Sequence, residues 1–126
     1  METITPGMIG ESEATVTDNL TARAMGSGSL DVYATPAMIA LMEAAAVAAL
    51  ASALPEGQTS VGVALDVAHL AATPLGGSAR ARAQVTGVEG RRVTFSVQAW
   101  DAKQLIGEGS HTRVVVDVRR FMSRLS

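Results

Sequence analysis

The segment ATPAMIALMEAAAVAALASAL occupies residues 34–54 and is apolar at almost every position. Thr35 is a suitable N-cap and Pro36 fits the first helical position, while Ala, Leu and Met are strong helix formers. The sequence therefore predicts a helix over Ala37–Leu54 that ends before Pro55. Because apolar residues cover nearly its whole circumference, we expect this helix to be enclosed by other structure.

Alternating apolar and polar residues on both sides of this helix predict β-strands. One strand is expected before the helix, and four strands in an antiparallel meander are expected after it. In chain order the five runs are Glu13–Ala24, Val61–Ala71, Ala79–Val85, Val93–Ala99 and Leu105–Val118. The third and fourth runs form a hairpin around Glu89 and Gly90. Gly107 and Gly109 in the last run indicate a bulge or a close approach of backbones.

One helix and one antiparallel sheet make an α+β protein, and a sheet wrapped around a central α-helix is the economical arrangement because it buries the helix. This is the hot-dog fold. It leaves a polar outer face made of Arg80, Arg82, Thr94, Ser96 and Gln98. The length of 126 residues fits a single domain over 1–126. A sheet of this size cannot fully cover the helix, so we expect two chains to pair through edge strands as a homodimer, with a tetramer left open.

The composition argues against several classes of partner. A net charge of −2 and only four aromatic residues do not suit nucleic acid. Glu43 interrupts the apolar run before it reaches the length that a bilayer requires, so no membrane segment is expected. The absence of cysteine excludes disulfides and thiolate sites and is compatible with a cytoplasmic location. Two histidines without clustered carboxylates predict no metal site, and no cofactor is indicated.

Glu43 and His69 are the first candidates for chemistry. Glu43 is the only ionisable residue between Pro36 and Leu54, and a lone carboxylate on a buried helix is costly unless it is paired. The alternative is that its side chain reaches a wet edge. His69 shares one strand face with Val61, and by itself such a histidine is more often a hydrogen-bonded core residue. Together, an acid on the helix and an imidazole on the inner strand face can meet and act as an acid/base pair.

Other residues carry weaker signals. Thr35 has a structural explanation as an N-cap, although the helix N-terminus also provides free N–H groups for an oxyanion. Gly62 lets a ligand carbonyl approach the backbone, or else it packs against the alanine-rich helix. Arg91 and Arg92 are candidates for phosphate binding, or else they are solvated charges. His111 is interpreted as structural.

Three quoted motifs resemble the fluoroacetyl-CoA thioesterase family of hot-dog proteins. They are ATPAMIALME at residues 34–43, VGVA at 61–64 running to HLAATP at 69–74, and VEGRR at 88–92. The resemblance extends over about Tyr33 to Val116. It implies that the chain hydrolyses acyl-CoA thioesters with Thr35, Glu43 and His69 as the catalytic set. It also implies substrate contacts for Gly62, near the thioester carbonyl, and for Arg113, which matches a family arginine.

Upstream of Tyr33 the chain departs from the family, because the aromatic lid of the fluoroacetate-specific member is replaced by Ala24-Met25-Gly26-Ser27-Gly28-Ser29-Leu30. We therefore expect a short or medium acyl group without selectivity for fluorine. In the expected mechanism Thr35 is a nucleophile or positions water, His69 is the acid/base, and Glu43 orients His69 or activates water.

Eight residues of helix separate Thr35 from Glu43 by about 12 Å. This distance is too long for a direct hydrogen bond between the two side chains. We therefore expect an unwound first turn, a substrate lying between them, or a site shared between two chains, and we favour the shared site. Two alternative functions remain. One is a non-catalytic hot-dog protein that binds acyl-CoA or another small apolar ligand. The other is a hot-dog hydratase, for which the usual Asp and His placement is missing.

Overall fold

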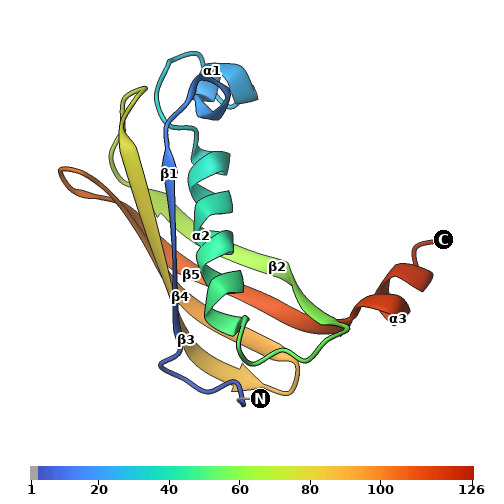
Figure 1. Ribbon diagram of the computed structural model, residues 1–126. Helices are drawn as coiled ribbons and strands as arrows, with labels where there is room; N and C mark the ends of the chain where they lie inside the picture. The colour runs from blue at the N-terminus through green and yellow to red at the C-terminus, as the bar shows by residue number, and fades with distance from the viewer. Residues whose placement is uncertain (1–2) are drawn as a thin grey trace.

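The computed structural model describes residues 3–126 and has five strands and one long helix (Figure 1). The strands are β1 (Ile9–Thr15), β2 (Gln58–His69), β3 (Ser78–Glu89), β4 (Arg92–Asp101) and β5 (Leu105–Asp117). The helices are η1 (Asp18–Leu20, a 3-10 turn), α1 (Ala22–Met25), α2 (Thr35–Leu50) and α3 (Val118–Ser123). All neighbouring strands are antiparallel, in the order β1-β3-β4-β5-β2. The predicted α+β hot-dog fold is confirmed.

The core lies between α2 and the inner face of the sheet. Small side chains dominate it, so the helix approaches the strands closely. At Gly10 of β1, an added Cβ would overlap the backbone of Ala45 and Ala49 in α2. At Gly107 of β5 it would lie 2.5 Å from the sulfur of Met38. At Gly109 an added Cβ would overlap the backbone of Asp66, so the close approach of backbones predicted there is confirmed, whereas the neighbour of Gly107 is a side chain. The outer face is polar as expected, with Arg80 over the Trp100 ring and Arg82 paired with Glu11.

Two expectations about the strands are wrong. The run Glu13–Ala24 is not one strand, because β1 ends at Thr15 and the Thr21 side chain accepts a hydrogen bond from the Ala24 N–H and caps α1. The four later strands are not a simple meander either. Only β3, β4 and β5 follow one another, whereas β2 pairs with β5 at the edge of the sheet. Alternation assigns residues to faces, but it does not identify the neighbouring strand.

A bulge in β2 changes which residues face the helix. The pairing shifts between Gly62, opposite Arg113, and Ala64, opposite Thr112. One residue is thus inserted into β2, and the alternation changes phase there. Strict alternation from Val61 would put Gly62 and His69 on opposite faces, but both lie on the helix side. The sequence alternation could not show this because the bulge residue, Val63, is apolar like its neighbours.

The β2 side of the sheet is only partly covered. In the part of the chain that the structure describes, β2 has one neighbour, β5, and α2 lies mainly against β1 and β3. Val63 and Leu65 of β2 and Val47 of α2 are nearly half exposed. Among residues 3–126, no helix is long and apolar enough to cross a membrane.

Candidate active site

Thr35 and His69 meet at the start of α2. Ala34, not Thr35, occupies the N-cap position, and no side chain caps the helix there. Pro36 still lies in the first helical turn, as predicted. The Thr35 hydroxyl is therefore free to lie 2.8 Å from Nδ1 of His69, at the end of β2. The expected capping role of Thr35 is wrong, because this hydroxyl faces the imidazole.

The environment of His69 favours the neutral imidazole. Burial lowers the pKa of His69, and the nearby backbone of Ala71 offsets this only in part. With its proton on Nε2, the ring accepts a hydrogen bond at Nδ1 from the Thr35 hydroxyl. Nε2 is buried and has no hydrogen-bond partner among residues 3–126. The second nitrogen of this histidine therefore needs an acceptor from outside the chain.

An open hollow of about 350 Å³ adjoins this pair. It is lined by Ala22, Ser27, Val32, Tyr33, Thr35, His69, Leu70, Ala71 and Ala72. Burial raises the pKa of Tyr33 to about 12, so its phenol stays protonated and donates to the Ala37 carbonyl at 3.3 Å. Thr35 and His69 therefore supply a hydroxyl and a base in direct contact at this hollow.

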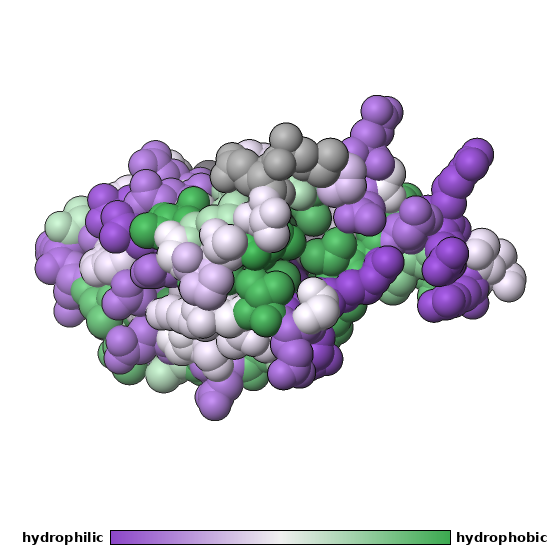
Figure 2. Space-filling model, turned by 90° about the horizontal axis from the view of Figure 1, so that it is seen from below, coloured by the Kyte–Doolittle hydropathy of each residue, from purple (hydrophilic) through white to green (hydrophobic). Residues whose placement is uncertain are grey.

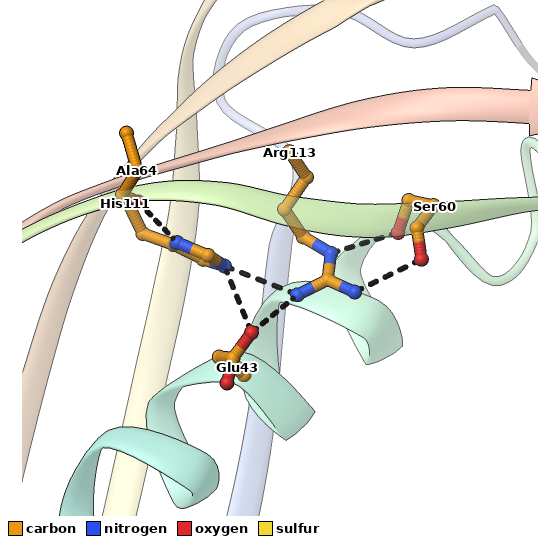
Figure 3. A network of polar contacts seen from close by, with 5 residues as sticks. All are labelled: Glu43, Ser60, Ala64, His111 and Arg113. Carbon is orange, nitrogen blue, oxygen red and sulfur yellow. Dashed lines mark hydrogen bonds and ion pairs between the residues drawn. The ribbon is translucent and has the colours of Figure 1, made fainter. Parts of the chain in front are cut away.

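Glu43 belongs to a second cluster (Figure 3). Its Oε2 accepts a hydrogen bond from Nη1 of Arg113 at 3.1 Å. The rest of that guanidinium is held by Ser60, because Nε donates to the Ser60 hydroxyl at 2.8 Å and Nη2 donates to the Ser60 carbonyl at 3.0 Å. Arg113 is buried, whereas the Glu43 side chain is 37% exposed. This arrangement fixes one carboxylate oxygen of Glu43 and leaves the other without a bond to residues 3–126.

His111 completes the cluster in a single tautomer. Its Nδ1 lies 2.8 Å from the Ala64 carbonyl, which can only accept, so Nδ1 carries the proton. Its Nε2 lies 3.1 Å from Nη1 of Arg113, which can only donate, so Nε2 is the acceptor. Nε2 of His111 also lies 3.9 Å from Oε2 of Glu43. It supports Arg113 from the side opposite to Ser60.

Gly62 faces this cluster directly. A Cβ at position 62 would lie 2.5 Å from Oε2 of Glu43, 3.1 Å from Cε1 of His111 and 3.3 Å from Nη1 of Arg113. The absence of a side chain is therefore what gives the Glu43 carboxylate its room. The glycine lies against the helix, as one of its two sequence interpretations proposed, and it meets a carboxylate there.

The structure brings the predicted residues together in two groups rather than one. Thr35 lies with His69, while Glu43 lies with Gly62 and Arg113. Within one chain, Glu43 therefore does not orient His69, and the hollow beside His69 does not include Glu43. About 12 Å of helix separates the two groups.

The three predicted arginines are placed differently. Arg91 and Arg92 are exposed at the β3–β4 hairpin. Arg113 has protein partners for most of its N–H groups, and its direct contact with substrate remains a prediction. Sequence reasoning missed Ser60 altogether and treated His111 as structural only. A serine at the start of a strand gives no signal of its own.

Comparisons with known proteins agree on one family. Residues 16–119 match the fluoroacetyl-CoA-specific thioesterase family, FlK. The fluoroacetyl-CoA thioesterase of Streptantibioticus cattleyicolor is 41% identical over 95 residues, which are 75% of this chain and 68% of that protein. A solved structure of the fluoroacetyl-CoA thioesterase FlK superposes with a TM-score of 0.91 at 33% identity and covers 98% of this chain and 96% of its own. A thioesterase superfamily member from Thermus thermophilus gives 0.90 at 30% identity, covering 99% and 93%.

Proposed function

This chain belongs to the fluoroacetyl-CoA-specific thioesterase family and is a thioester hydrolase, and we propose that it cleaves acyl-CoA thioesters with short or medium acyl groups. The observation that carries this proposal is the Thr35 hydroxyl, 2.8 Å from Nδ1 of a neutral His69 at an open hollow. A hydroxyl with an adjacent base is the arrangement that acyl transfer requires. A variant of the FlK thioesterase has been solved in complex with acetyl-CoA, which fits this substrate class.

The size of the acyl group is argued from the hollow. Ala22, Ser27, Ala71 and Ala72 line it with small side chains, and none of the residues 24–30 beside it is aromatic. Small side chains leave space for a chain longer than acetyl, and apart from the Ser27 hydroxyl they offer no polar group to a fluorine atom. The hollow therefore favours a range of unsubstituted short and medium acyl groups.

The complete site is proposed to form between two copies of the chain. β2 is an edge strand with exposed Val63 and Leu65, and an antiparallel pair of β2 strands would bury them. A two-fold axis between Leu65 and Asp66 of β2 places His69 of one strand opposite Gly62 of the other. Glu43 of one copy then approaches Nε2 of His69 in its partner, the buried nitrogen that has no acceptor within residues 3–126. This pairing restores the expected Glu43 and His69 couple.

The proposed reaction begins when Thr35 gives its hydroxyl proton to Nδ1 of His69 and its oxygen attacks the thioester carbonyl. N–H groups at the start of α2 or at Gly62 stabilise the oxyanion. The carbon–sulfur bond breaks, and the imidazolium returns the proton to the CoA thiolate. Water, deprotonated by His69, then attacks the Thr35 ester; the bond between the acyl carbon and the Thr35 oxygen breaks, and the imidazolium returns the proton to that oxygen as the carboxylic acid leaves. Alternatively, the Thr35 hydroxyl only positions a water that attacks directly. Mass spectrometry of quenched enzyme distinguishes the two, because only the first route leaves an acyl group on Thr35.

A panel of acyl-CoA substrates with detection of free thiol tests the function. Thiol release by the wild-type chain, lost in Glu43→Gln and in His69→Ala while both stay folded, is the expected result. Water addition to an enoyl-CoA without thiol release would indicate the hydratase alternative, and neither reaction would indicate the ligand-binding alternative. No cofactor is proposed, since every step uses side chains or water. We propose a cytoplasmic location, with which the lack of cysteine is compatible.

A further inference from the structure

Half of the ten lysine and arginine residues gather at one end of the molecule. They lie on the β3–β4 hairpin and on the C-terminal segment, and they are Arg91, Arg92, Arg119, Arg120 and Arg124. All five are exposed, and within residues 3–126 none of them forms an ion pair. Figure 2 views this end and shows hydrophilic side chains projecting beside an apolar surface. Such a group of like charges in a protein of net charge −2 repels itself and favours an anionic ligand.

Three of these arginines border a single hollow. It has a volume of about 320 Å³ and lies where α3 leaves the end of β5. Its lining is Arg91, Val114, Val115, Val116, Asp117, Arg120, Phe121 and Arg124. The hydrogen bond from the Val115 N–H to the Arg91 carbonyl, 2.9 Å, fixes the hairpin against β5. Asp117 accepts from the Arg120 N–H as the N-cap of α3. The hollow thus combines three guanidinium groups with one aromatic ring.

We propose that Arg91, Arg120 and Arg124, with Phe121, bind the phosphorylated adenosine of the CoA substrate. Guanidinium groups match phosphate oxygens in a bidentate geometry, and an aromatic ring offers a surface on which a base stacks. A hollow of about 320 Å³ suits one nucleotide rather than a nucleic acid strand. This inference rests on the proposed acyl-CoA substrate and assigns a role to α3, which sequence reasoning did not predict.

The position of the hollow suits this ligand. Arg113, beside Glu43, and Asp117, at the hollow, are four residues apart on β5, about 13 Å along the strand. CoA requires such a separation, because its pantetheine arm lies between the thioester and the phosphates. In the proposed antiparallel pairing of β2 strands, the Gln58 end of one strand points toward the His69 end of the other. Since Gln58 pairs with Asp117, α3 of one copy lies on the His69 side of its partner.

Binding of adenosine 3′,5′-bisphosphate, measured by calorimetry, tests the site without turnover. The variant Arg120→Ala with Arg124→Ala is compared with Arg80→Ala with Arg82→Ala, which removes the same charge from the outer face of the sheet. We expect the first pair to weaken binding by about tenfold or more, as loss of charge-assisted hydrogen bonds implies, and the second pair to leave it unchanged. Equal affinity in both double variants would overturn the proposal.

Kinetics separate this proposal from the proposed function. In the Arg120 and Arg124 variant, the preference for acetyl-CoA over acetyl-pantetheine, as the ratio of kcat/KM values, should fall by about tenfold. If no thioester is cleaved by the wild-type chain, the proposed function fails while the calorimetric result still tests the site. If the variant loses binding to anionic phosphatidylglycerol vesicles but keeps its affinity for the bisphosphate, the arginines serve a membrane surface and the proposal is wrong.

Discussion

Gly62→Ala is a small change that should strongly impair catalysis. The added Cβ lies 2.5 Å from Oε2 of Glu43, whereas an ordinary contact begins at 3.4 Å. The carboxylate must therefore move by about 0.9 Å, and Nη1 of Arg113, 3.3 Å from the same Cβ, is also crowded. A misplacement of about 1 Å in a catalytic group can cost ~10²-fold in rate, or about 2.7 kcal/mol of activation free energy. We expect a loss of this size in kcat for acetyl-CoA.

The assay is thiol release at saturating acetyl-CoA, together with the melting temperature. The φ of Gly62 is not positive, so alanine is compatible with the backbone and the fold should persist. Gly87→Ala in β3 is the matched control, because a Cβ there meets nothing within 4 Å. Wild-type kcat in Gly62→Ala, or an equal loss in both variants, would show that the position of Glu43 does not limit the reaction.

Three further predictions address the site and the fold. Burial lowers the pKa of His69 within one chain, whereas a Glu43 carboxylate from the second copy beside Nε2 would raise it. The pKa of His69, followed by NMR, should therefore be lower in Glu43→Gln than in the wild type, and equal values would contradict this contact. Ser60→Ala removes the buried 2.8 Å hydrogen bond from Nε of Arg113 and should lower the free energy of unfolding, measured with urea, by about 1.5–3 kcal/mol. Ser60→Thr keeps the hydroxyl and should lower it less, so equal losses would contradict this role. Gly10→Ala pushes β1 away from the α2 backbone and should lower the free energy of unfolding by about 2–3 kcal/mol, whereas Gly87→Ala should not lower it. An unchanged value for Gly10→Ala would mean that β1 and α2 can move apart without loss of stability.

Local patterns predicted most of the elements. The apolar segment predicted α2, and alternation predicted the inner faces of β3 and β4, because each pattern reflects burial within one element. The hairpin followed from Glu89-Gly90, and Gly90 does adopt a positive φ of 61°. Patterns of this kind carry no information on which strands are neighbours, so the place of β2 beside β5 was missed.

The site depended on features that alternation hides. The bulge in β2 places Gly62 opposite Glu43, and a bulge in an apolar run leaves no mark in the sequence. The roles of Ser60 and His111 depend on three-dimensional contacts with Arg113, formed across β2 and β5. Thr35 and His69 were identified as candidates. Their 2.8 Å contact depends on where β2 ends, which the sequence did not show.

The proposed active site uses residues from two copies of the chain. Subunit complementation tests it directly: Glu43→Gln and His69→Ala chains, each inactive alone, are unfolded together, refolded as a mixture and assayed for thiol release. In a mixed dimer, one site then combines the intact Glu43 of one chain with the intact His69 of the other. Random pairing therefore predicts recovery of about a quarter of wild-type activity. Mixed dimers that form, as shown by co-purification through a tag on one chain, yet release no thiol would contradict the claim.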